Sequence, residues 1–195
     1  MDNAASPRHR KILRLPAYDY RSAGAYFVTV CSFRRRPSLD APEARAATRD
    51  AIPAHFPQAR TDAFVIMPNH VHGIVWIVHE RGVGARHASP LHPGDAHWPA
   101  WQPRGVPPGS LGAIVGSFKS AATKRINEIL RTPGEKVWQR NYYERVIRDE
   151  RELAAIREYI VLNPLKWHLD RENPERQPDM DWQERWSWLE EGLLV

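Results

Sequence analysis

The stretch that decides the fold is residues 63–78, AFVIMPNHVHGIVWIV, in which two apolar runs flank the dipeptide Pro68-Asn69. A proline followed by an asparagine is typical of a tight turn, so the two runs predict the strands of a β-hairpin. An earlier run, residues 26–33 with the sequence YFVTVCSF, is apolar on both faces and predicts a strand in the middle of a sheet.

The segments on either side of the hairpin predict two helices and a last strand. Residues 42–57 contain several alanines and predict a helix that Pro53 kinks or breaks. Ser110 suits the N-cap of a helix, and after it apolar residues recur at helical spacing as far as Ile129. Residues 137–147 then suit a strand with its lead-in.

A further helix follows this strand. Asp149 and Glu152 have the spacing of a capping box, and the helix that they open is expected to end near Asn163 because Pro164 follows. The order strand, helix, strand, strand, helix, strand, with a closing helix, matches the ferredoxin-like βαββαβ plan. We therefore expect an α+β fold, an antiparallel sheet backed by helices, with the candidate catalytic helix at the C-terminal end.

Composition narrows the class of protein. The chain has 195 residues, 42% of them hydrophobic, which is enough for one domain over residues 1–195. The net charge of +5 and a sequence pI near 9.6 favour an anionic partner such as nucleic acid. The single cysteine excludes an internal disulfide, and no apolar run approaches the roughly 18 residues of a membrane helix. With no signal peptide at the start either, we expect a cytoplasmic protein without membrane association.

Three segments differ from the rest of the domain. Residues 1–20 form a basic N-terminal arm that is either disordered or in contact with phosphates. Residues 79–109 are rich in proline, glycine and histidine and exceed the usual loop length of about 4–6 residues, so they predict an insertion. Residues 165–195 form a C-terminal tail with a short helix that packs across the domain.

The first candidate site is the motif His70-Val71-His72 at the start of a predicted strand. Residues two apart on a strand project from the same face, so both imidazoles converge and offer two ligands to a divalent metal. Val71 then points into the opposite layer. The alternative is that the histidines are two ordinary polar residues beside a turn.

The second candidate is the pair Tyr159 and Asn163, which are four apart on a helix and so lie one turn from each other on the same face. Both border the apolar stripe, where a hydroxyl and an amide need hydrogen-bond partners or a polar cavity. The alternative is that Tyr159 keeps its hydroxyl in solvent and Asn163 merely ends the helix.

The third feature is a set of basic residues interleaved with aromatic ones, an arrangement typical of proteins that hold unpaired nucleic acid. The candidate DNA-contacting residues are Arg34, Arg35, Arg36, Lys119, Lys124, Arg140, Arg145 and Lys166. The aromatic residues near them include Trp138, Tyr142, Tyr143 and Trp167.

Three blocks of the sequence resemble those of the REP-associated tyrosine transposases, a branch of the single-tyrosine HUH endonucleases. They are VIMPNHVHGI at 65–74, WQRNYYE at 138–144 and REYIVLNPLKW at 157–167, and the resemblance extends in order from about residue 10 to residue 167. It implies that His70 and His72 bind the metal. It further implies that Tyr159 is the nucleophile and that Asn163 stands where wider single-tyrosine transposases have a glutamine ligand.

The resemblance also implies an activity. The chain would cleave single-stranded DNA by transesterification with Mg²⁺ or Mn²⁺, through a 5′-phosphotyrosine intermediate. The substrates would be hairpin-forming repeats, and the protein would act as a monomer or a homodimer. Tyr143 is the alternative nucleophile, although it lies on a predicted strand without a polar partner at helical spacing.

Two other functions stay open from the sequence. One is a nucleic-acid-binding protein that keeps the fold without cleaving DNA. The other is a metallohydrolase in which His70 and His72 act with a histidine of the insertion, namely His87, His92 or His97.

Overall fold

The computed structural model describes residues 18–51, 58–78, 106–170, 173, 175, 176 and 180–190. The strands are β1 (Gly24–Cys31), β2 (Ala59–Ile66), β3 (His70–Ile77) and β4 (Tyr143–Ile147). The α-helices are α1 (Pro42–Asp50), α2 (Leu111–Leu130), α3 (Glu150–Leu162) and α4 (Met180–Glu190), and two 3-10 segments are η1 (Phe33–Arg35) and η2 (Asn163–Leu169).

The four strands form one antiparallel sheet in the order β2-β3-β1-β4. With the chain order β1, α1, β2, β3, α2, β4, this is the ferredoxin-like arrangement, so the α+β prediction is confirmed. The two strands with the most continuous apolar sequence, β1 and β3, occupy the centre, where both faces are covered.

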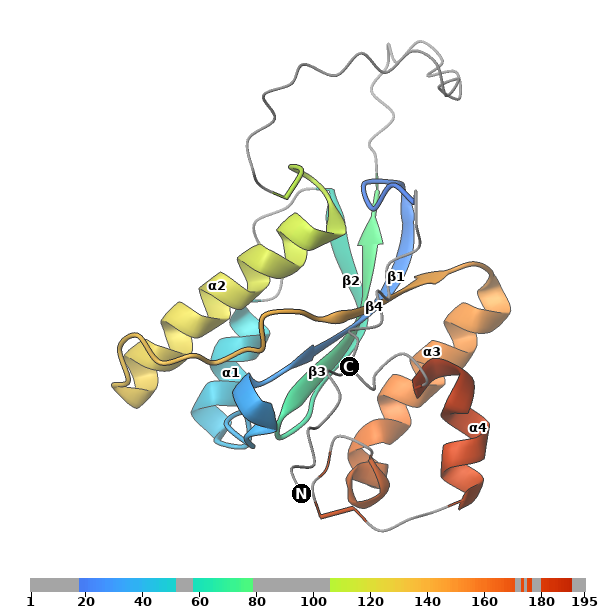
Figure 1. Ribbon diagram of the computed structural model, residues 1–195. Coiled ribbons are helices and arrows are strands. Elements are labelled where there is room, and N and C mark those ends of the chain that lie inside the picture. The colour runs from blue at the N-terminus through green and yellow to red at the C-terminus, as the bar shows by residue number, and fades with distance from the viewer. Residues whose placement is uncertain are drawn as a thin grey trace, which may run out of the picture.

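The two faces of the sheet carry separate layers of helices, with α1 and α2 on one side and α3 and α4 on the other (Figure 1). Val71 belongs to the core beneath α2, whereas Ile74 belongs to the core with α3 and α4. Successive residues of a strand point to opposite faces, so His70 and His72 lie on the side of Ile74. The histidine pair therefore faces the layer that contains the tyrosine helix.

Local hydrogen bonds explain where the elements begin. The amide of Met67 donates to the carbonyl of His70 at 2.8 Å, which closes the Pro68-Asn69 turn between β2 and β3. The Ser110 hydroxyl accepts from the Ala113 amide at 3.3 Å and caps α2. The turn and the helix cap were both predicted from the sequence.

The predicted capping box of α3 is present with one of its two hydrogen bonds changed. Asp149 accepts from the Glu152 amide at 2.8 Å as expected, whereas the Glu152 carboxylate accepts from the Arg148 amide at 2.8 Å rather than from that of Asp149. The helix ends at Leu162 before Pro164, as predicted, and the chain continues in the 3-10 conformation of η2.

Two predicted strands differ in their bounds from the real ones, since β1 spans 24–31 rather than 26–33 and β4 spans 143–147 rather than 137–147. β1 ends at Cys31 because η1 follows, in which Arg34 and Arg35 adopt positive φ angles of 57° and 55°. β4 begins only at Tyr143, and its lead-in contributes a single bridge between Ser32 and Trp138. α1 ends at Asp50, ahead of Pro53.

Residues 1–17 of the predicted arm (1–20), residues 79–105 of the insertion (79–109) and part of the tail lie outside the described residues, so what was predicted of them remains untested. Within the described ranges, no helix is both long and apolar enough to cross a bilayer.

Candidate metal centre and tyrosine site

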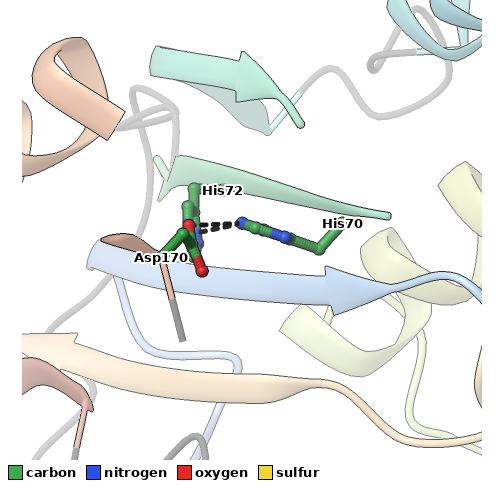
Figure 2. Close-up of side chains that lie close together, drawn as sticks. All are labelled: His70, His72 and Asp170. Carbon is green, nitrogen blue, oxygen red and sulfur yellow. Dashed lines mark hydrogen bonds and ion pairs between the residues drawn. The ribbon is translucent and has the colours of Figure 1, made fainter. Parts of the chain in front are cut away.

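His70 and His72 lie at the start of β3 with their imidazoles facing each other in the interior (Figure 2). Both residues are completely buried, and their Nε2 atoms are 2.9 Å apart. The expectation that the two rings project from the same face is confirmed. The β-strand itself brings two nitrogen donors together.

The other nitrogen of each ring has its own partner. Nδ1 of His70 lies 2.9 Å from Oδ1 of Asn69, and Nδ1 of His72 lies 2.8 Å from Oγ1 of Thr29. An amide oxygen only accepts, so His70 carries its proton on Nδ1 and exposes a lone pair on Nε2. Partners of this kind fix the orientation of metal-binding imidazoles.

Burial keeps both imidazoles neutral. Loss of solvation lowers the pKa of His72 to about 3. Burial also lowers the pKa of His70 well below its ordinary value, with smaller contributions from the charges of His72 and Arg35. Because a neutral imidazole is the form that ligates a metal, the pair is ready to bind one at neutral pH.

Asp170 joins the histidines from the end of η2, as Figure 2 shows. Its Oδ2 lies 3.7 Å from Nε2 of His70, and its side chain is 5% exposed. The donor atoms of His70, His72 and Asp170 all lie within 4.8 Å of one another. Two imidazole nitrogens and a carboxylate oxygen are donors that suit a divalent ion, so the residues fit the metal that the motifs imply.

The sequence alone did not reveal Asp170. A non-periodic segment separates Asp170 from α3, and in such a segment no spacing rule predicts which way a side chain points. The usable signal was weaker: an acidic residue in an apolar and aromatic stretch shortly after the tyrosine helix.

Tyr159 lies on the buried face of α3 and is 2% exposed. The centroid of its ring is 5.2 Å from that of His72 and 6.1 Å from that of Phe27, in both cases edge-on. Trp186 of α4 packs on the tyrosine at 5.2 Å. The alternative that Tyr159 is a boundary residue with its hydroxyl in solvent is therefore wrong.

Asn163 is the C-cap residue of α3, four residues after Tyr159, and is 1% exposed. Its Oδ1 has no hydrogen-bond partner among the described residues. A buried amide oxygen without a partner costs free energy, so this atom is a candidate donor to a ligand.

An ion pair fixes the position of α3 against the sheet. The guanidinium of Arg157 donates to the Asp62 carboxylate of β2 at 2.7 and 3.0 Å. The indole of Trp76 donates to the same carboxylate at 3.1 Å. The Arg157 hydrogen bond, followed by those of Trp76 and the Ala63 amide, lowers the pKa of Asp62 to about 2 despite partial burial.

Two of the predicted DNA-contacting residues also hold the fold together. The Lys119 ammonium donates to the carbonyls of Gln139, Arg140 and Asn141 at 2.6, 3.2 and 3.0 Å, and burial lowers its pKa to about 8. Arg145 pairs with Glu152 at 2.6 Å and lies over the ring of Trp188.

The other predicted basic residues are more accessible. Arg34, Arg36, Lys124 and Arg140 are exposed, and Arg35 and Lys166 are half-buried. Arg35 lines a cavity of about 560 Å³ together with Asn69 and Trp167. Because Asn69 is bonded to His70 and the Trp167 ring lies 6.0 Å from it, this cavity adjoins the histidine pair.

The alternative nucleophile, Tyr143, is buried on β4 and packs edge-on against Phe27. It pairs with Thr29 of β1, which pairs in turn with His72, so one whole strand separates it from the histidine. The loop residues His87, His92 and His97 lie outside the described residues.

The chain is similar to solved structures and to a bacterial protein sequence. No family model matches the chain. Its fold is similar to the "Structure of the REP associates tyrosine transposase bound to a REP hairpin", with 20% identity over 79% of this chain and 73% of that chain and a TM-score of 0.47. A candidate transposase from Deinococcus radiodurans matches with 19% identity over 76% of this chain and 95% of that chain, at a TM-score of 0.41.

The sequence is also 36% identical over 181 residues to an uncharacterized protein of Haemophilus influenzae. The matched region covers 86% of this chain and 94% of that protein. The chain belongs to the same family as this Haemophilus protein.

Proposed function

We propose that this protein is a metal-dependent endonuclease and strand transferase of single-stranded DNA, a transposase in which Tyr159 is the nucleophile. The observation that carries the proposal is the contact between Tyr159 and His72, whose ring centroids lie 5.2 Å apart. The phenol on α3 and the two imidazoles on β3 are thereby close enough to act on one phosphodiester.

In the proposed reaction, the phenolic oxygen of Tyr159 attacks the phosphorus of the scissile phosphate. A bond forms between the tyrosine oxygen and phosphorus, and the bond from phosphorus to the 3′ oxygen breaks. The products are a 5′-phosphotyrosine and a free 3′-OH, which takes up a proton as the phenol loses one. The reverse attack by a different 3′-OH rejoins the strands and requires no external energy source.

The metal would be held by His70 and His72. A bound Mg²⁺ or Mn²⁺ supplies charge neutralisation at the scissile phosphate and fixes its orientation. Tyrosine with its ordinary pKa near 10 is a weak nucleophile at neutral pH, so positioning beside the phosphate is essential. Asn163, with its unpartnered amide oxygen, is proposed as a further neutral donor.

Substrate access sets a condition on this chemistry. Tyr159 is 2% exposed and lies under Trp186 of α4. A DNA strand reaches the phenol only after Trp186 withdraws from it. Cleavage therefore requires a movement of Trp186, either of its side chain or of α4.

The exposed arginines and lysines and the cavity beside His70 are the proposed DNA-binding surface. Arg35 and Trp167 line that cavity, and together they provide a cation for a phosphate and a ring for a base. Stacking of one base on an aromatic side chain is worth about 1–3 kcal/mol. We propose single-stranded DNA with hairpins as the substrate.

The test is incubation with single-stranded DNA that carries hairpins from the flanks of the gene, with Mn²⁺ or Mg²⁺, followed by denaturing electrophoresis. We expect a covalent protein–DNA adduct with the wild type and with Tyr143→Phe, and none with Tyr159→Phe. An adduct that persists in Tyr159→Phe would overturn the assignment of the nucleophile. DNA binding without any adduct in the wild type would identify a non-cleaving binding protein instead.

The same assay separates the metallohydrolase alternative. Replacing His87, His92 and His97 together leaves the adduct intact if the proposed reaction is correct. Loss of the adduct in that variant would show that a histidine of the insertion belongs to the site.

A further inference from the structure

We infer that Asp170 is the third protein ligand of the metal, and that metal binding therefore fastens the segment after the tyrosine helix to β3. The inference rests on the proposed function for the metal site itself, yet metal binding can be measured without DNA and without cleavage. Nothing in the His-x-His motif or in the spacing of Tyr159 and Asn163 points to this carboxylate.

The distances suit one ion. Two ligand atoms that each lie about 2.1 Å from a metal are separated by about 3.0–3.4 Å when they are neighbours in the coordination shell. The two Nε2 atoms are 2.9 Å apart, and Oδ2 of Asp170 lies 3.7 Å from Nε2 of His70. All three donor atoms lie within 4.8 Å of one another, so a movement of the carboxylate by about 1 Å brings them into the shell.

The burial of the carboxylate supports the same assignment. The Asp170 side chain is 5% exposed, and those of both histidines are completely buried. The ring of Trp167, which is in the same 3-10 segment, lies 6.0 Å from His70. A divalent ion between the rings would interact favourably with this buried carboxylate.

Asp170 brings a property that Asn163 lacks. An amide oxygen is neutral, whereas a carboxylate contributes a negative charge and is a preferred ligand of Mg²⁺ and Mn²⁺. With Asp170 bound, the site carries a net charge of about +1 rather than +2. Asn163 is then left as an additional neutral donor.

The position of Asp170 in the chain gives the ligand a second effect. Its amide donates to the carbonyl of Trp167 at 3.1 Å, and its carbonyl accepts from the amide of Asn173 at 3.0 Å. These bonds tie the carboxylate to η2 and to the residues that follow it. A metal shared by β3 and Asp170 thus holds the C-terminal end of α3 in place, and Tyr159 with it.

The experiment measures Mn²⁺ binding to the full chain by calorimetry and by the paramagnetic resonance signal of free Mn²⁺. We expect Asp170→Asn to weaken binding by at least tenfold. The matched control, Asp40→Asn, removes the same charge from an exposed carboxylate of the neighbouring cavity and changes the affinity less than twofold. Tyr159→Phe retains wild-type affinity, which separates this inference from the nucleophile assignment.

Two results would overturn the inference: an Asp170→Asn protein that binds Mn²⁺ as tightly as Asp40→Asn does, or a wild type that binds no Mn²⁺. Circular dichroism without metal shows whether each variant is folded. Should Asp170→Asn fail to fold, wild-type crystals grown with Mn²⁺ decide the matter, because the anomalous peak must lie within bonding distance of the carboxylate. A peak bonded to the histidines alone contradicts the assignment.

Discussion

Thr29 and His72 face each other across β1 and β3, and the threonine hydroxyl lies 2.8 Å from Nδ1 of the histidine. His70 carries its proton on Nδ1, so His72 donates from Nε2 to Nε2 of His70 at 2.9 Å and accepts from Thr29 at Nδ1. With Nε2 of His72 as a metal ligand, the proton of that ring would lie on Nδ1. Thr29 must then accept where it had donated, which a hydroxyl can do.

The first prediction concerns this hydroxyl. We expect Thr29→Val to weaken Mn²⁺ binding by about 10–100-fold, because the methyl group leaves Nδ1 of His72 without a partner in either protonation state. Thr29→Ser keeps the hydroxyl and is expected to stay close to wild type. Calorimetric titration of both variants checks the difference, and equal affinities would show that the hydroxyl has no such role.

The second prediction concerns pH and the metal-free protein. Burial lowers the pKa of both histidines, that of His72 to about 3, so the unfolded chain binds protons below pH 6.5 that the folded chain does not. Stability is thus complete above about pH 6.5 and falls as the pH drops toward 3, by at most about 1.4 kcal/mol per pH unit for each histidine. Urea unfolding between about pH 5 and pH 7.5 measures this slope.

Matched variants assign that slope to the buried rings. His72→Gln is expected to reduce it, whereas His168→Gln, at an exposed position of η2, leaves it unchanged. A slope that survives in His72→Gln at its full size would mean that other groups cause the acid sensitivity.

The sequence allowed much of this architecture to be predicted, for reasons that are local. The two-residue period of a strand placed His70 and His72 on the same face of β3. The spacing of four residues placed Tyr159 and Asn163 on the same face of the helix α3. Asp170 was not predicted as a site residue because it follows a 3-10 segment, in which the direction of each side chain depends on how the tail packs. The early end of β1 was missed for a similar reason: positive φ angles at Arg34 and Arg35 are not signalled by arginine, which rarely adopts them.

A third prediction separates two roles among the basic residues. Lys119→Met leaves three carbonyls without their ammonium donor, so we expect it to lower the free energy of unfolding by about 1–3 kcal/mol. Arg140→Gln, at an exposed position, is expected to preserve stability and to weaken single-stranded DNA binding with a shallower salt dependence. Thermal melting and fluorescence anisotropy distinguish these effects, and the opposite pattern would reverse the two roles.

A fourth prediction concerns the ion pair that holds α3. Asp62→Asn weakens its bonds to Arg157 and Trp76, so the tyrosine helix is less firmly placed while the histidines on β3 are untouched. We expect slower formation of the DNA adduct, with a loss of Mn²⁺ affinity much smaller than that in Asp170→Asn because every proposed metal ligand is retained. Glu150→Gln is the control, since Glu150 contacts the same arginine at 3.6 Å from an 80% exposed side chain. A loss of Mn²⁺ affinity in Asp62→Asn as large as that in Asp170→Asn would contradict this division.

Because both imidazoles project from one central strand, the spacing of the two nitrogens is set by the sheet before any ion arrives. Such a rigid pair has little means of rejecting a competitor by adjusting its shape. Nitrogen donors bind first-row divalent ions in the order that rises from Mn²⁺ to Cu²⁺, with Zn²⁺ also above Mn²⁺. The identity of the ion in the cell would then follow from supply, and zinc or copper would compete with Mn²⁺ wherever they are available.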